Sequence, residues 1–241
     1  MNARLIFKME LFKYLRDKFY LIAALVLLIL NILTTVLFVN FEHLSSGLLG
    51  TAILLGIILL FSNMIFLGII YPFHLLAIDY KNRVLALMVA SGVNRSKLFF
   101  SKIGATILAT VVMSIILTIV PIGTIFFEVG ANGGWDELFQ NIGVIMAPEM
   151  VPLSIYSVLG YIAGLVMLMT AVILLKGKTL SILLYFGFSF IVSMVVAGPL
   201  MSSSTFDSGA TASSWINVGI EAVVILVFGF IALQSIRHQN L

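Results

Sequence analysis

One carboxylate, Glu221, lies inside a long apolar stretch and is the strongest candidate for chemistry in this sequence. Counted from Trp215, it lies roughly 9 Å into that stretch if each helical residue rises about 1.5 Å. A charged side chain costs about 2.5–3.5 kcal/mol at a bilayer centre and less near its surface. Glu221 must therefore be protonated, hydrogen-bonded to a neighbour, or facing a wet cavity, where it would meet a cationic substrate. The alternative is a side chain that extends to the nearby interface. Asn31 and Asn63 are further candidates for a substrate path, although Asn63 is equally suited to holding two helices together.

The patterns that would support an enzyme are missing from the sequence. There is no Cys, and the three His are too dispersed to suggest a metal cluster. Gly177-Lys178-Thr179 imitates the end of a phosphate-binding loop, but the glycine required at position 172 is Val172. No nucleophile motif and no pair of carboxylates at one membrane depth occurs. We therefore predict no catalytic residue, no metal site and no ATP site in this chain.

The composition indicates an all-α integral membrane protein. Of the 241 residues, 61% are hydrophobic and only 10% are charged, and the mean hydropathy is +1.20. Soluble domains carry about 25% charged residues, so a soluble or disordered chain is excluded. Long gaps without charges can each hold one spanning helix of about 20 residues. They predict a single domain over residues 1–241 with six membrane-spanning helices at 19–40, 48–76, 101–127, 151–175, 179–201 and 215–236.

The basic residues predict the orientation of these spans. All 13 Lys and Arg lie before the first span, between spans two and three, between spans four and five, or after span six. The loops on the opposite side contain no Lys or Arg, and their charged residues are Asp and Glu. Because cytoplasmic loops carry the excess of Lys and Arg, both termini are predicted to lie in the cytoplasm.

Two glycine patterns predict local features of the spans. Gly68 and Pro72 predict a bend near the cytoplasmic end of the second span. Gly160 and Gly164 form a Gly-x-x-x-Gly face on the fourth span, which predicts close helix packing within the chain or between two copies.

Residues 3–16 predict an amphipathic helix, within an interfacial segment 1–18. One apolar stripe, with cations on another face, is formed by Leu5, Met9, Phe12 and Leu15. Such a helix lies in the membrane interface with its cations near anionic headgroups. The alternative is a simple positively charged anchor of the first span.

The connection between spans two and three predicts a short cytoplasmic helix. Asp79 is a suitable N-cap and Gly92 a suitable residue just after the helix end. Tyr80, Leu87 and Met88 belong to one apolar stripe between them. An apolar stripe in so exposed a position predicts docking, either onto a partner protein or onto the membrane base of the chain itself.

This arrangement resembles the ABC-2-type permeases, which are membrane subunits of ATP-binding-cassette transporters. The features that carry the resemblance are the six spans, the basic elbow helix and the short helix between spans two and three. The matching residues of that connection are Asp79, Leu85, Leu87, Met88, Ser91-Gly92, Asn94-Arg95 and Lys102. The chain departs from the family at Lys81-Asn82-Arg83-Val84, where Glu-x-Gly-Thr is common, and at Gly92, where Pro is common.

The resemblance implies a permease subunit of an exporter in a bacterial plasma membrane. It would pair with a second permease copy, identical or not, and would be driven by a separate ATPase subunit that binds ATP and Mg. Size and small outer loops most resemble permeases for bacteriocins or other amphipathic peptides, with lipids or drugs as other substrates, in export or in immunity. No nucleic acid is implied.

The residues implied to couple the permease to the ATPase are Asp79, Lys81, Arg83, Leu87, Met88, Asn94 and Arg95. The alternative is an ATP-independent membrane protein, such as a secondary carrier, an interaction protein or an intramembrane enzyme.

Overall fold

The computed structural model describes residues 3–39, 46–81, 88, 92–131, 135–136, 139, 143, 151–202 and 210–238. This part of the chain is helical and contains no β-strand. Its elements, in chain order, are α1 (Ala3–Leu15), α2 (Lys18–Val39), α3 (Ser46–Ile65), the π-helical turn η2 (Phe66–Ile70), α4 (Tyr71–Lys81), α6 (Arg95–Ala131), α8 (Val151–Leu174), α9 (Leu180–Ser202) and α10 (Ala210–His238).

The apolar helices indicate a membrane protein. Five segments are long and apolar enough to cross a bilayer: Tyr20–Leu37, Ile53–Tyr80, Arg95–Thr124, Val151–Leu174 and Trp215–His238. In α9 the corresponding apolar stretch, Leu180–Val195, is shorter. Large apolar side chains such as Ile119 and Leu226 are exposed on these helices, and lipid tails are the surroundings that suit such a surface. A helix lies at each of the six predicted positions, but the six-span topology itself stays a prediction.

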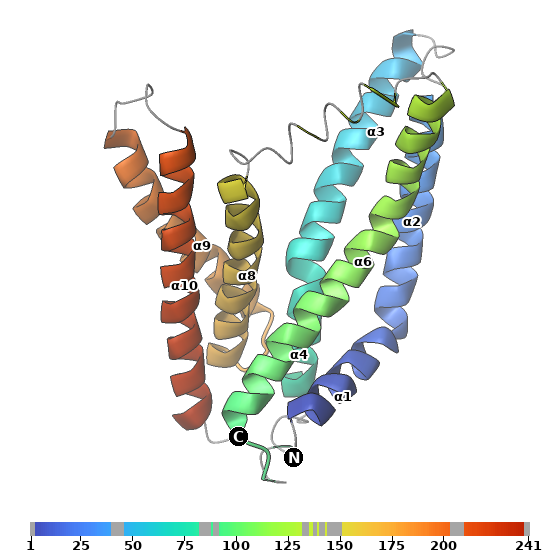
Figure 1. The fold of residues 1–241 in the computed structure, drawn as a ribbon. Coiled ribbons are helices and arrows are strands. Elements are labelled where there is room, and N and C mark those ends of the chain that lie inside the picture. The colour runs from blue at the N-terminus through green and yellow to red at the C-terminus, as the bar shows by residue number, and fades with distance from the viewer. Residues whose placement is uncertain are drawn as a thin grey trace.

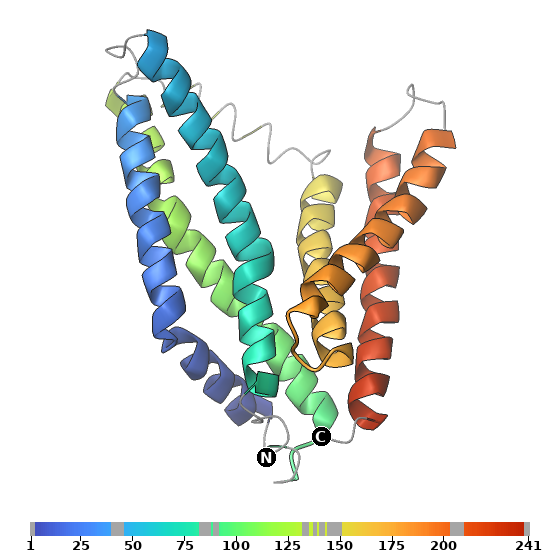
Figure 2. The same cartoon turned by 180° about the vertical axis from the view of Figure 1, so that it is seen from behind.

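The helices form two groups that meet at one end and diverge towards the other (Figures 1 and 2). The first group contains α2, α3 and α6, with α1 at its lower end, and the second contains α8, α9 and α10. α4 packs against both α6 and α8 where the groups meet. We call this end, which holds α1, α4 and the end of α10, the base.

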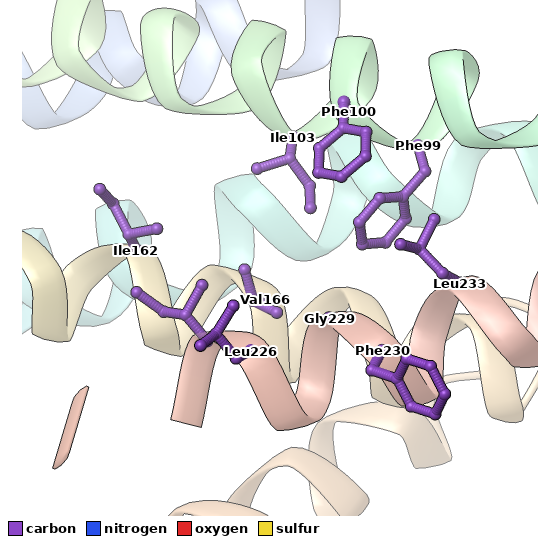
Figure 3. Close-up of a pocket in the computed structure, with 10 residues that line it drawn as sticks. Phe99, Phe100, Ile103, Ile162, Val166, Leu226, Gly229, Phe230 and Leu233 are labelled. Atoms are coloured by element: carbon purple, nitrogen blue, oxygen red, sulfur yellow. The ribbon is translucent and has the colours of Figure 1, made fainter. Parts of the chain in front are cut away.

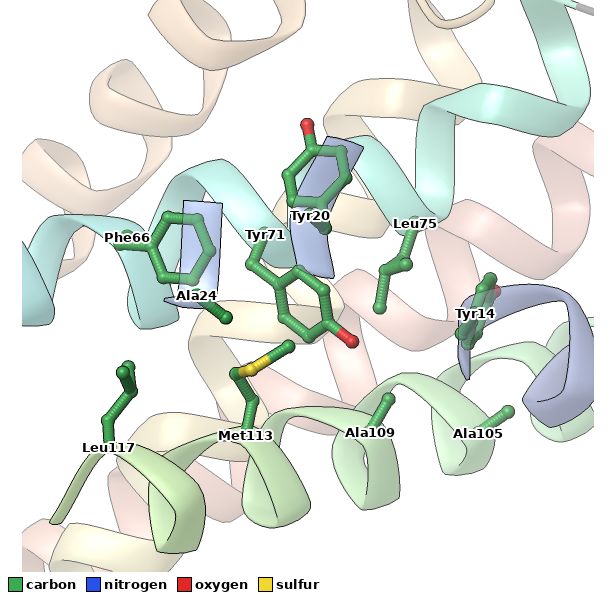
Figure 4. Packing of buried hydrophobic residues seen from close by; sticks show 10 residues of the cluster. All are labelled: Tyr14, Tyr20, Ala24, Phe66, Tyr71, Leu75, Ala105, Ala109, Met113 and Leu117. Atoms are coloured by element: carbon green, nitrogen blue, oxygen red, sulfur yellow. The ribbon is translucent and has the colours of Figure 1, made fainter. Parts of the chain in front are cut away.

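Small and aromatic side chains fill the contact between α1, α2, α4 and α6 (Figure 4). Ala105 and Ala109 lie one turn apart on α6 and are buried, so that neighbouring helices can approach closely. The ring of Tyr71 lies 5.5 Å from that of Tyr20 and 5.8 Å from that of Phe66, measured between centroids. These distances are typical of favourable aromatic contacts.

α8 is the most enclosed of the long helices. Its buried side chains, among them Leu168, Met169 and Val172, pack against α4 and against Ala232 and Ile236 of α10. Thr170 also donates a hydrogen bond across the interface, from Oγ1 to the carbonyl oxygen of Phe228 at 3.1 Å. The contact between α8 and α10 therefore combines apolar packing with an interhelical hydrogen bond.

Regular α-helical bonding is interrupted between α3 and α4. The backbone N–H of Tyr71 donates to the carbonyl oxygen of Phe66, which is the spacing of a π-helix. Pro72 follows directly and has no N–H to donate, and its ring crowds the carbonyl four residues earlier, that of Gly68. A π-helical turn therefore lies at the place where Gly68 and Pro72 predict a bend.

In the connection after α4, the structure contradicts one predicted helix boundary and confirms another. The prediction that Asp79 caps the start of a new helix is wrong, because Asp79 lies inside α4, which continues to Lys81. The prediction for Gly92 is confirmed: its φ is +80°, and the N–H of Val93 donates to the carbonyl of Met88 at 3.2 Å. This bond is the one that closes a helix end of the Schellman type.

Among the glycines that the structure describes, Gly177, in the turn between α8 and α9, is expected to tolerate substitution least. Its φ is +74°, and a Cβ atom there would lie 2.7 Å from Cβ of Tyr80 and 3.2 Å from the carbonyl oxygen of Ala77. Gly177→Ala should therefore lower the free energy of unfolding by about 1–3 kcal/mol, since strain and a clash with α4 add. Gly187→Ala is the matched control, because nothing lies within 4 Å of the added atom. Equal thermal stability of the two variants in detergent would contradict this account of the turn.

Candidate functional site

The inner face of α1 brings polar groups into the base. Ile6, Glu10 and Tyr14 follow one another at helical spacing, are at most 2% exposed, and lie on the side of α1 that packs against α6. The opposite side exposes the apolar Leu5 and Phe12. The predicted apolar stripe of this helix is therefore turned away from the protein interior, while a second, inner face binds it to the bundle.

Asp79 joins three helices at the base. Its Oδ1 accepts a hydrogen bond from Nζ of Lys13 in α1, and its Oδ2 accepts one from Nζ of Lys102 in α6, both at 2.5 Å. Asp79 is 2% exposed and Lys102 is fully buried. Both oxygens of one carboxylate are thus used to hold α1 and α6 to the end of α4.

Glu10 completes this cluster. Its Oε2 lies 2.7 Å from Nζ of Lys13, one turn along α1. Two carboxylates and two ammonium groups then alternate as Glu10, Lys13, Asp79 and Lys102, so the formal charges cancel. We call these four residues the base cluster. Burial, with the nearby carboxylates of Glu10 and Asp79 adding to it, raises the pKa of the adjacent Tyr14 well above its ordinary value, so this phenol stays neutral.

A second side-chain contact ties the turn between α1 and α2 to α4. Oδ2 of Asp17 lies 2.6 Å from Nε2 of His74, and the ring of Tyr20 lies 4.0 Å from the His74 ring, between centroids. Lys13 lies in the last turn of α1 and Asp17 in the turn that follows it, and they contact Asp79 and His74 respectively. The N-terminal helix is therefore fixed to α4 at two points.

The predicted coupling residues that the structure describes contact their own chain. Oδ1 of Asn94 accepts a hydrogen bond from the N–H of Ser96 at 3.0 Å, which makes Asn94 the N-cap of α6. Arg95 donates to the carbonyl oxygens of Ile236 and Arg237, at 2.5 and 2.9 Å, and so caps the end of α10.

The apolar residues of the connection also pack inward. Met88 and Tyr80 contact a buried cluster formed by Ile6, Val93 and Leu98. This packing favours the predicted alternative in which the connection docks onto the membrane base of the same chain. The side chain of Lys81, together with Arg83 and Leu87, lies outside the described residues.

The predicted path residues fall into two separate places. Asn31 of α2 and Asn63 of α3 bind one another, with Nδ2 of Asn63 donating to Oδ1 of Asn31 at 3.0 Å and the reverse bond at 3.5 Å. Both amides are thereby used between α2 and α3, in the manner of interhelical hydrogen bonding. Glu221 lies in the other helix group.

Glu221 is half-buried in α10 and lies against a glycine of α8. A Cβ atom added to Gly160 would lie 3.8 Å from Oε1 of Glu221, whereas one added to Gly164 would lie 3.5 Å from the hydroxyl of Tyr185. The Gly-x-x-x-Gly face therefore packs within the chain and leaves room for the carboxylate. Asn217, one turn before Glu221, has a buried Oδ1 without a hydrogen-bond partner among the described residues. Asn217 lies four residues before Glu221, and this helical spacing places both on one face of α10. Asn217 was not among the predicted site residues, although this spacing could have indicated it.

A small cavity with mostly apolar walls and a few polar side chains lies between the two helix groups. Its volume is about 260 Å³, and it is lined by residues of η2, α6 and α8, including Leu67, Thr110, Ser114 and Tyr161. Among the described residues, neither this cavity nor any cluster of His, Asp and Glu has the composition of a metal site. The chemistry that the described part offers is ion pairing at the base and polar contact between the groups.

Comparison of the chain with protein-family models, with curated proteins and with solved structures gives no match.

Glu221→Gln is expected to preserve the fold, because the amide keeps the shape of the carboxyl group and fits beside Gly160. Stability should hold or rise by up to about 1 kcal/mol, since a charge that is costly to bury is removed. If Glu221 faces a substrate path, transport of a cationic peptide should fall while an uncharged substrate is affected less. Asp136→Asn is the control, because Asp136 is exposed.

Thermal stability and transport measured on the same Glu221→Gln preparation distinguish the possible roles. Unchanged transport of a cationic substrate would rule out a path-facing carboxylate and favour one that extends to the interface. A marked loss of stability would instead indicate that Glu221 takes part in a buried hydrogen-bonded network.

Proposed function

We propose that this chain is the membrane subunit of an ATP-binding-cassette exporter of the ABC-2 type. A separate ATPase subunit would bind and hydrolyse ATP, and a second permease copy would complete the translocation path. The substrate class that we propose is an amphipathic, cationic peptide, with lipids and drugs as other candidates. The chain itself would carry out no covalent chemistry.

The observation that carries this proposal is the position of the base cluster. The connection between α4 and α6 is the segment that resembles the ATPase-coupling segment of the family, and Asp79 and Lys102 stand on its two sides. Because Asp79 binds both Lys102 and Lys13, a displacement of the connection would move α1, α4 and α6 together. A rigid base of this kind is what a partner needs in order to act on membrane helices from outside the bilayer.

The proposed topology has six spans, with α9 as the fifth and with both termini and the base in the cytoplasm. It is supported by the distribution of all 13 Lys and Arg. α1 would lie in the inner membrane interface, since Leu5 and Phe12 are exposed together with the cations Arg4 and Lys8. The diverging ends of the two helix groups would then face outward.

The proposed mechanism is a shift between two arrangements of the helix groups. Closure of the ATPase dimer on ATP would push on the connection and favour one arrangement, and release would favour the other. α8 and α10 pack extensively with one another, whereas α6, which belongs to the first group, meets the second group through Phe99 near the base. A rotation about the base would therefore change the separation of the groups at their far ends.

Co-purification tests the proposal against an ATP-independent carrier. The chain should be isolated in mild detergent together with an ATP-binding-cassette ATPase expressed from the neighbouring reading frame, at one ATPase per permease. A chain that remains alone with that ATPase present, and that transports solutes down an ion gradient, would instead be a secondary carrier.

Labelling of single cysteines tests the orientation, since the chain has no Cys of its own. Cysteines at Ser45, Asn132 and Ser208 should react with a membrane-impermeant thiol reagent added to intact cells. Cysteines at Asn82 and Asn240 should react only after the membrane is opened. Labelling of Asn82→Cys in intact cells would reverse the topology and remove the proposed contact with a cytoplasmic ATPase.

A further inference from the structure

An apolar groove runs between α6, α8 and α10 near the base, separate from the base cluster. Its volume is about 430 Å³, within the range of about 300–1,000 Å³ that is usual for small-ligand sites. Figure 3 shows Phe99, Phe100 and Ile103 reaching from α6 towards α10. The surface of the groove is formed by carbon atoms almost throughout.

The groove has a buried floor and an exposed rim. Phe99 and Val166 are at most 4% exposed, whereas Phe100, Leu226 and Phe230 are 63, 72 and 67% exposed. The rim residues belong to segments that are apolar enough to span a membrane. The groove therefore opens towards lipid tails rather than towards water.

Two arginines lie at the base end of the groove. Arg95 lies one helical turn before Phe99 on α6, and Arg237 lies one turn after Leu233 on α10. Arg95 donates to the carbonyls of Ile236 and Arg237, and Arg237 donates to the hydroxyl of Ser96 at 3.5 Å. These bonds bring both arginine side chains to the contact between the start of α6 and the end of α10, where the carbon-lined surface ends. Among the described residues, Arg237 has no carboxylate partner within ion-pair distance.

We propose that this groove binds one acyl chain of an anionic phospholipid of the inner leaflet, with the lipid phosphate held by Arg95 and Arg237. The carbon-lined surface suits a hydrocarbon chain, and guanidinium groups suit the oxygens of a phosphate. The distance from Arg95 to Ile103 along α6 is about 12 Å at 1.5 Å per residue, so the site lies within one leaflet. Basic pockets between spanning helices on the cytoplasmic side are a known kind of site for anionic headgroups. This inference needs the membrane orientation proposed above but not the ATPase.

Photo-crosslinking tests the site with a defined probe. The purified chain is reconstituted into vesicles of phosphatidylglycerol or of phosphatidylcholine, each with a trace of the same lipid carrying a diazirine on one acyl chain. Crosslinked residues are then identified by mass spectrometry. We expect Phe100, Phe230 and the half-buried Ile103 to be labelled several-fold more than Ile22 and Leu183, which are highly exposed. The excess should occur with phosphatidylglycerol and not with phosphatidylcholine.

Arg237→Gln should reduce labelling of the groove from phosphatidylglycerol about fivefold, the factor that one cation near an anionic lipid contributes. Arg16→Gln is the matched control, because Arg16 is exposed at the same end of the bundle but on α1. Both variants should elute in size-exclusion chromatography as the unmodified chain does. Equal labelling from the two lipids, or no response to Arg237→Gln, would overturn the proposal. So would crosslinks of Phe230 to a second copy of the chain in place of lipid.

Discussion

Asp79→Asn is expected to lower the free energy of unfolding by about 3–5 kcal/mol, because it leaves an uncompensated charge among buried groups. The asparagine keeps the shape of the side chain, but the cluster then contains two ammonium groups and one carboxylate. Lys102, which is fully buried, would lose its carboxylate partner. Chemical unfolding in detergent measures the loss, and Asp136→Asn, at an exposed carboxylate, should change stability by less than about 0.5 kcal/mol.

A double variant separates the ion pairs from simple loss of packing. Lys102→Met alone leaves the base cluster with an excess negative charge, and Asp79→Asn alone leaves an excess positive one. Together they leave Glu10 paired with Lys13, so the double variant should be clearly less destabilised than the sum of the single variants. Strict additivity would contradict the view that Asp79 and Lys102 stabilise the base as a pair.

Loss of transport with ATP hydrolysis retained is the second large effect that we expect, and it concerns the connection between α4 and α6. Arg83→Glu or Leu87→Asp should leave membrane insertion intact and should uncouple hydrolysis from transport, lowering transport by about tenfold or more. A coupling free energy of about 1.4 kcal/mol corresponds to that factor. The assay is ATP hydrolysis and transport measured in the same proteoliposomes.

Arg95 is less suited to this test than the sequence suggests. Because it caps α10 through two carbonyl oxygens, charge reversal there should disturb helix packing as well as coupling. Lys97→Glu is a better control than Arg95→Glu for the charge reversal at Arg83, since Lys97 is an exposed cation of the same segment. Variants at Arg83 and Leu87 that bind the ATPase and transport normally would show that the connection does not transmit the motion.

The helix positions were predictable because the membrane imposes one strong pattern on the sequence. A span must be apolar for about 20 residues, so charged residues such as Lys18, Lys176 and Arg237 define the segments between them. Gly92 was also predictable, since a positive φ at a helix end strongly favours glycine. These are local signals, and the structure reproduces them to within a few residues at most helix ends.

The base cluster was not predictable, because its bonds are far apart in the chain. Lys13 and Asp79 are separated by 66 positions, and Asp79 and Lys102 by 23. From sequence, Asp79 resembles an N-cap, and Lys13 is one of several cations before the first span. Only the packing of α1 on α6 brings them together. The pairing of Asn31 with Asn63 was missed as a pair for the same reason, although each residue was identified.

The most direct test of the account is whether an ATPase moves the two helix groups relative to one another. Spin labels on cysteines that replace Ile122 of α6 and Trp215 of α10, both half exposed or more, report their separation by pulsed electron paramagnetic resonance. In the complex of this chain with its ATPase, trapping of nucleotide should change that distance, and Leu87→Asp should abolish the change. A distance that stays the same with ATPase bound and nucleotide trapped would contradict the proposed function.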